Sequence, residues 1–89
     1  MQVKARHILV QTLNEAVEVH NKINEGHDFA QLAAKLSKCP SGRSGGDLGF
    51  FQRGQMVQPF EDATYNLDVG GTSGPVQTQF GYHIIQRTG

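Results

Sequence analysis

Two segments with β-strand patterning, one near each end of the chain, constrain the fold most. Residues 3–10 (VKARHILV) are rich in β-branched side chains, which favours a strand. Residues 82–87 (YHIIQR) alternate between two sets of side chains, the period of a half-buried strand. Each segment carries a histidine, His7 or His83, at the head of an apolar triplet. We expect both strands in the centre of one sheet, where the two histidines can face each other across adjacent strands.

Three segments between these strands have the patterning of amphipathic helices. Thr12 and Glu15 form the Thr-x-x-Glu pattern of a capping box, which predicts a helix over residues 13–25. Asp28 is a suitable N-cap for a second helix, and Pro59 suits the first position of a third. The side chains expected on the buried helix faces are Leu13, Ala16, Val17 and Ile23, then Phe29, Leu32, Ala33 and Leu36, then Phe60, Ala63 and Leu67.

The remaining segments are a loop and two short strands. Residues 37–47 (SKCPSGRSGGD) have loop composition, and residues 48–51 (LGFF) and 76–78 (VQT) are typical of short strands. The order strand, helix, helix, strand, helix, strand, strand predicts an α+β fold with a mainly antiparallel sheet. The length of the chain allows one hydrophobic core, so we expect a single domain over residues 1–89.

Charge and cysteine content limit the class of partner and the compartment. Eight basic residues balance eight acidic ones, so charge gives no reason to expect nucleic acid or a membrane surface as a partner. Basic residues outnumber acidic ones over residues 35–53, which favours a solvated face or, alternatively, a weak attraction for acidic peptides. The single cysteine, Cys39, excludes an internal disulfide and fits a reducing compartment. With no signal-like or membrane-spanning apolar run, we expect a cytoplasmic location.

The individual motifs give little support for phosphate binding, metal binding or thiol-dependent hydrolysis. The glycine-rich residues 42–46 lack the Gly-Lys-Ser/Thr ending of a phosphate loop. His7, His83 and Cys39 lack the close ligand spacing of a metal site, so no metal is expected. Cys39 could be a nucleophile activated by a histidine, as in a small Cys-His hydrolase, or simply a small half-buried residue. No third residue that would orient such a pair is evident.

Several strings taken together resemble the parvulin family of peptidyl-prolyl cis–trans isomerases. They are HILV at 7–10, GGDLG at 45–49, RGQM at 53–56, PFED at 59–62 and GYHII at 81–85. Their order and spacing match the family along the whole chain. The resemblance implies a four-stranded antiparallel sheet surrounded by helices in the order β-α3-β-α-β2. It also implies a third short helix around residues 40–43, before the second strand.

The resemblance implies roles for eight residues. Leu48, Met56 and Phe60 would line the pocket for the proline ring, and Phe80 would flank the substrate. The catalytic centre would consist of the paired His7 and His83, linked through Thr78, and of Cys39, which would face the peptide bond. No cofactor is implied.

One departure separates the chain from the phosphorylation-dependent eukaryotic members. Those proteins carry basic residues directly after the first strand, whereas residues 11–14 (QTLN) contain none. The chain resembles the minimal, stand-alone prokaryotic parvulins, which implies a monomer acting on proline-containing peptides and unfolded protein segments without modification. A non-catalytic peptide-binding or chaperone module on the same scaffold is the alternative.

Overall fold

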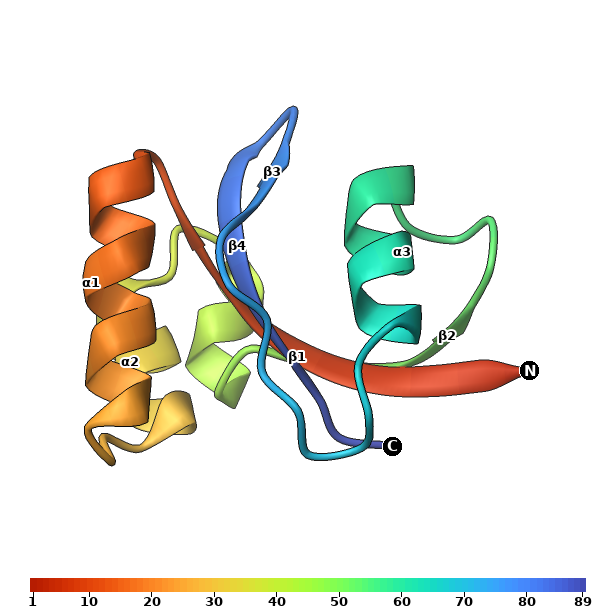
Figure 1. The fold of residues 1–89 in the computed structure, drawn as a ribbon, viewed down its shortest axis with the longest axis horizontal. Helices are drawn as coiled ribbons and strands as arrows, with labels where there is room; N and C mark the ends of the chain where they lie inside the picture. Colours follow the sequence, from red (N-terminus) through yellow and green to blue (C-terminus); the bar gives the residue numbers. More distant parts are fainter.

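The computed structural model describes residues 1–89. The elements follow the predicted order and include the short helical turn that the family resemblance implies before the second strand (Figure 1). They are β1 (Gln2–Val10), α1 (Leu13–Asn24), α2 (Phe29–Leu36), the 3-10 helix η1 (Pro40–Ser44), β2 (Asp47–Gln52), α3 (Gln58–Tyr65), β3 (Val76–Thr78) and β4 (Gly81–Arg87). The α+β prediction is therefore confirmed.

The four strands form one antiparallel sheet in the order β2-β1-β4-β3, so the first and last long strands are central, as predicted. In the β1–β4 register His7 lies opposite Ile85 and Leu9 lies opposite His83. Residues two apart on a strand share a face, so His7 and His83 are diagonal neighbours on the same face of the sheet.

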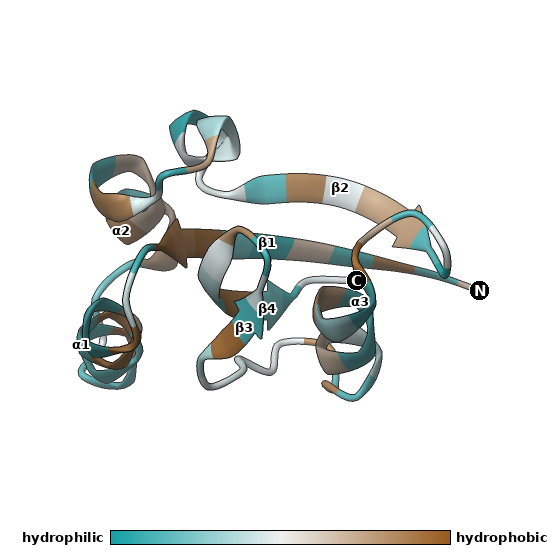
Figure 2. Ribbon diagram, turned by 90° about the horizontal axis from the view of Figure 1, so that it is seen from above, coloured by the Kyte–Doolittle hydropathy of each residue, from teal (hydrophilic) through white to brown (hydrophobic).

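Side chains of β4 alternate between two cores on opposite faces of the sheet. Ile84 belongs to the larger core, which α1 and α2 cover, and Ile85 belongs to the smaller core, which includes Phe51 and, from α3, Phe60. The two helical layers lie on either side of the sheet in Figure 1, and in Figure 2 the most hydrophobic end of β1 lies next to α1 and α2. Both histidines are on the face of the smaller core.

Helix α1 begins with the predicted capping box between Thr12 and Glu15, but its buried face differs from the prediction. Ala16 and Val19 are the buried side chains of α1. Leu13 and Val17, predicted to be buried, are 50% and 42% exposed. The helix packs on the sheet through a narrow stripe, and these two residues lie on its flank at i and i+4.

The other two helices follow the sequence pattern more closely. Asp28 caps α2 by accepting the Gln31 N–H, and the predicted apolar face of α2 packs in the larger core. Helix α3 buries Phe60, as predicted, and begins at Gln58, one residue before the predicted first position at Pro59. It also buries Glu61, which was not predicted. None of the helices combines the length and apolar composition needed to cross a membrane.

A close backbone contact fixes the segment between α2 and β2 against β1. The Gly46 carbonyl accepts the His7 N–H at 3.0 Å, and Gly46 N–H donates to the Ser41 carbonyl at 2.8 Å. Gly46 has a φ of 84°, and a Cβ there would collide with the His7 backbone. Glycine is therefore required where η1 is held beside the histidine.

Candidate active site

An open pocket of about 500 Å³ lies on the histidine face of the sheet. It contains seven of the eight residues to which the family resemblance assigns a role, and Thr78 lies directly behind His83. Its lining residues are His7, Leu9, Lys38, Cys39, Pro40, Leu48, Gln55, Met56, Val57, Phe60, Phe80 and His83. The fold therefore brings the whole predicted set together.

The apolar part of the pocket comes from three separate elements. Leu48 extends from β2, Met56 from the loop after β2, and Phe60 from α3. The Phe60 ring meets the rings of His7 and His83 edge-on, at centroid distances of 5.3 and 5.2 Å. One aromatic side chain thus joins the apolar wall to the histidine pair.

The two histidines form a hydrogen-bonded, stacked pair. Their Nδ1 atoms lie 2.9 Å apart, and their rings are 17° from parallel at a centroid distance of 5.1 Å. The outer nitrogen of each ring also has a partner: His7 Nε2 lies 3.2 Å from Ser41 Oγ, and His83 Nε2 lies 2.7 Å from Thr78 Oγ1. All four ring nitrogens are therefore engaged.

One arrangement of hydrogens satisfies every group along this chain. Ser41 Oγ donates to Cys39 Sγ at 3.2 Å, and a hydroxyl has only one hydrogen to give. In this arrangement His7 Nε2–H donates to Ser41, and His7 Nδ1 accepts from His83 Nδ1–H.

The same order of donors and acceptors continues beyond His83, towards Thr78 and Phe80. His83 Nε2 is left as an acceptor for the Thr78 hydroxyl, and Thr78 Oγ1 in turn accepts the Phe80 N–H at 3.2 Å. Five hydrogen bonds point one way, from the β3–β4 turn to the cysteine. In this arrangement both imidazoles are neutral.

Burial keeps the histidine pair uncharged. Desolvation, and for His7 also the neighbouring His83, lowers the pKa of His7 to about 4, and desolvation lowers the pKa of His83 to about 4. At neutral pH the site therefore contains a polar but uncharged network under an apolar pocket.

Cys39 lacks the surroundings of an activated nucleophile. It reaches His7 only through the Ser41 hydroxyl, whereas a Cys-His hydrolase places the base in direct contact with the thiol. No group of three or more His, Cys, Asp or Glu side chains is arranged to hold a metal ion.

Six site residues were not assigned from the sequence: the lining residues Leu9, Lys38, Pro40, Gln55 and Val57, and Ser41, which contacts His7 and Cys39. Ser41 follows Cys39-Pro40 in the short helical turn, and a lone serine in a loop carries no distinctive spacing. Lys38 is the one charged side chain that lines the pocket. Its backbone N–H donates to the Leu9 carbonyl at 2.7 Å, which places it at the rim next to β1.

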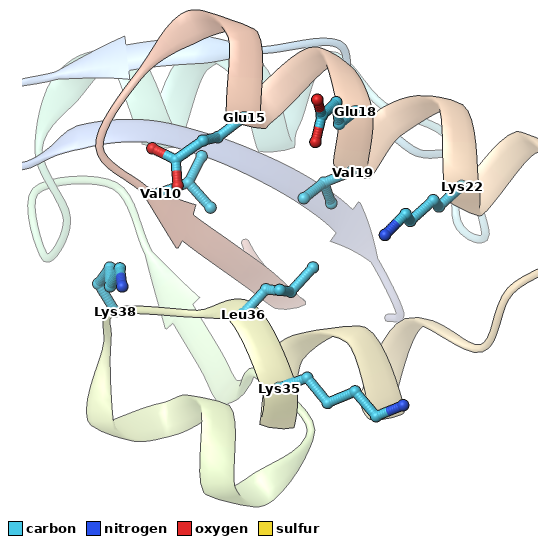
Figure 3. Close-up of a pocket in the computed structure, with 8 residues that line it drawn as sticks. All are labelled: Val10, Glu15, Glu18, Val19, Lys22, Lys35, Leu36 and Lys38. Atoms are coloured by element: carbon cyan, nitrogen blue, oxygen red, sulfur yellow. The ribbon is translucent and has the colours of Figure 1, made fainter.

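A second, charged cleft of about 150 Å³ lies between α1 and α2 (Figure 3). Its charged lining residues are Glu15, Glu18, Lys22, Lys35 and Lys38, above Val10, Val19 and Leu36. It contains no histidine or cysteine, and Glu15 already serves in the α1 cap. Its charges are mixed and it has no reactive group, so we assign it no chemistry.

Known proteins match both the sequence and the fold. The family model "Rotamase: PPIC-type PPIASE domain" matches residues 4–89. A foldase protein PrsA from Geobacillus is 50% identical over 88 residues, which is 98% of this chain and 32% of that protein. The chain thus spans about a third of the length of such curated relatives.

Solved structures of the same family also match the fold of this chain. The crystal structure of the peptidylprolyl isomerase PrsA from Bacillus anthracis superposes with a TM-score of 0.98 at 47% identity, covering 99% of this chain and 41% of that one. NmPin, the parvulin of Nitrosopumilus maritimus, gives a TM-score of 0.88 at 45% identity and is covered over 96% of its length. The chain belongs to the parvulin, or PPIC-type rotamase, family and forms a peptidyl-prolyl cis–trans isomerase domain.

Proposed function

We propose that this domain rotates X–Pro bonds in unmodified polypeptides by a non-covalent mechanism and thereby assists protein folding. The observation that supports this proposal best is the apolar pocket lying directly against an uncharged hydrogen-bond network. The proline ring enters between Leu48, Met56 and Phe60, and the peptide bond lies towards Cys39. The PrsA relatives are named foldases, which supports the role in folding.

The energy required of the site is small. Amide resonance opposes rotation with a barrier of roughly 18–20 kcal/mol, so uncatalysed exchange takes tens to hundreds of seconds. A barrier of about 15 kcal/mol corresponds to tens of turnovers per second. The domain must therefore stabilise the twisted state by only about 3–5 kcal/mol relative to the planar one, and no bond to carbon has to form or break.

An apolar pocket favours the twisted state because rotation removes amide resonance and makes the bond less polar. Holding the ring also anchors one side of the rotation while the preceding residue turns. The walls supplied by Met56 and Phe60 perform both tasks.

The histidine pair holds the polar groups of the site in fixed positions relative to one another. Its neutral rings connect Thr78 on one side with Ser41 and Cys39 on the other. A directed network of this kind presents fixed dipoles near the carbonyl without bringing a full charge to the pocket. In this mechanism Cys39 adjusts the local field and packing and does not attack the substrate.

An isomerase assay on a Leu-Pro peptide tests the proposal directly. We expect rate acceleration by the parent chain, strong reduction in Met56→Ala, and no cleavage of the peptide. A peptide-binding module would bind the peptide without accelerating exchange, and a hydrolase would cleave it. A monomeric state and a cytoplasmic location stay predictions, to be tested by analytical ultracentrifugation and by cell fractionation.

A further inference from the structure

We propose that Glu61 is a positioning residue of the proline pocket, whose buried carboxylate fixes the β2–α3 loop and so places Met56 against the substrate ring. This inference rests on the function proposed above for the pocket. Glu61 itself does not line the pocket, and it makes no hydrogen bond to the histidine network. Its effect on catalysis must therefore pass through the loop.

The loop needs an external anchor. Residues 53–57 connect β2 to α3 without helix or strand, yet Gln55, Met56 and Val57 all line the pocket. The turn is closed by Gln52 and Gln55, through a backbone hydrogen bond of 3.2 Å and a bond of 2.9 Å from Gln52 N–H to the Gln55 side chain. These contacts shape the turn but do not attach it to α3.

Glu61 supplies the attachment. One carboxylate oxygen accepts the Gly54 N–H, and the other accepts from the Arg53 guanidinium at 3.1 Å. Arg53 is held in turn by Asp62 at 2.9 Å and lies 4.3 Å from the centre of the Tyr65 ring. The start of the loop is thus joined to three residues of α3, namely Glu61, Asp62 and Tyr65.

Burial makes the attachment specific. Glu61 is 7% exposed, and it is the one buried carboxylate in the chain. A buried carboxylate is costly without partners, so the loop conformation that supplies Gly54 N–H and Arg53 is strongly preferred. The hydrogen bond with Asp62, and the one with Glu61, raise the pKa of Arg53 and keep it charged.

Helix α3 therefore shapes the pocket in two ways. Phe60 enters the wall directly, and Glu61, the next residue, fixes the loop that carries Met56. If Glu61 acts in this way, its removal should weaken substrate binding more than turnover. A purely structural role predicts lower thermal stability with unchanged KM.

The test compares kcat and KM on one Leu-Pro peptide for the parent, Glu61→Ala, Glu61→Gln and Thr12→Ala. We expect Glu61→Ala to raise KM by about fivefold or more, with kcat within about twofold. Glu61→Gln keeps an acceptor for Gly54 N–H and should recover part of the loss. Thr12→Ala removes the α1 capping box, far from the loop, and should lower Tm without changing KM. An unchanged KM in Glu61→Ala would overturn the inference.

A double variant separates this inference from the assignment of the pocket. If Glu61 acts through Met56, then adding Glu61→Ala to Met56→Ala should change KM little further. Additive losses, with Met56→Ala itself impaired, would overturn the role of Glu61 alone. A fully active Met56→Ala would overturn the pocket and this inference together.

A spectroscopic readout covers the case in which Glu61→Ala does not fold. The chain has two methionines, Met1 and Met56, so methyl NMR resolves the loop from the N-terminus. In Glu61→Gln we expect the Met56 methyl signal to shift and its order parameter to fall. A Met56 signal identical to that of the parent would refute the inference without any kinetic measurement.

Discussion

The Nδ1 atoms of His7 and His83 face each other at 2.9 Å, so one of the two nitrogens carries a hydrogen and the other accepts it. Because both rings are 4% exposed, the pair is most stable uncharged. The outer nitrogens extend this arrangement to Ser41 and Thr78. The protonation state of two side chains thus sets the hydrogen-bonding pattern of the whole site.

Stability should fall in mild acid because of this pair. The pKa of each ring is lowered to about 4 in the fold, against about 6.5 in the unfolded chain. Between these values the unfolded chain binds more protons, so the free energy of unfolding is highest above pH 6.5 and declines as the pH falls towards 4. Allowing for solvent screening near the open pocket, we expect a loss of about 2 kcal/mol for the pair at pH 5.

Denaturant unfolding at pH 7.5 and pH 5 measures this loss. His20 is a half-buried residue of α1, which covers the other face of the sheet, and it does not belong to the network, so His20→Gln should keep the pH dependence of the parent. A double variant His7→Gln, His83→Gln should show much less of it. Equal stability of the parent at both pH values would contradict the burial of a neutral pair.

Met56→Ala should lower kcat/KM on a Leu-Pro peptide by about tenfold, since it removes apolar contact worth about 1.5 kcal/mol with the ring. Circular dichroism should show an intact fold, because Met56 lies in a loop and is only partly buried. Full activity in a folded Met56→Ala would mean that the ring binds elsewhere.

Phe60 requires a milder substitution. It is 3% exposed and packs against Phe51 and both histidines, so Phe60→Ala should cost about 3–5 kcal/mol of stability. Phe60→Leu keeps more of the core volume and should lower kcat/KM while the domain stays folded. Parent-like kinetics in a stable Phe60→Leu would remove the ring contact from the mechanism.

A phosphorylated substrate should have little advantage. Lys38 is the one charged residue at the pocket, and residues 11–14 carry no basic side chain. A single exposed lysine contributes less than about 1 kcal/mol to binding an anion, so phospho-Ser-Pro should exceed Leu-Pro by no more than about fivefold in kcat/KM. Lys38→Ala should abolish whatever difference remains. A hundredfold preference would contradict this reasoning.

Cys39→Asp should retain more activity than Cys39→Ala. The Ser41 hydroxyl donates to Cys39 Sγ; a carboxylate can accept the same hydrogen bond, whereas alanine leaves the hydroxyl without this partner. We expect Cys39→Ala to lower kcat/KM by about tenfold, with neither variant reduced to the uncatalysed rate. Complete loss in both, with folding intact, would support a covalent role for the thiol.

The elements of the fold could be predicted because each depends on local patterning. The alternation around His83 and the capping box at Thr12 specify a strand and a helix start whatever surrounds them. The buried face of α1 could not be predicted in the same way. Val19 and Val17 are equally apolar, and only the angle at which α1 meets the sheet buries Val19 and exposes Val17.

Some residues of the site could be predicted from the sequence and others could not, for a similar reason. The strings that resemble the family led to His7, His83 and the pocket residues, and the structure brings them together. Ser41 and Glu61 escaped prediction because a single serine or glutamate has no characteristic spacing. Glu61 even had an adequate local explanation, as an acidic residue in the first turn of a helix. Its burial against Gly54 depends on a loop path that no periodicity encodes.

The adjacency of β1 and β4 sets the order in which the domain can become active during synthesis. On the ribosome β1 emerges early, but its partner on the histidine side is made only after α1, α2, β2, α3 and β3. Contacts between residues so far apart in sequence form late, since the loop between them must first be closed. A nascent chain that has not yet released β4 can hold its helices and the antiparallel β1–β2 pairing, yet it lacks one of the two histidines. The histidine pair is thus complete only once β4 has docked.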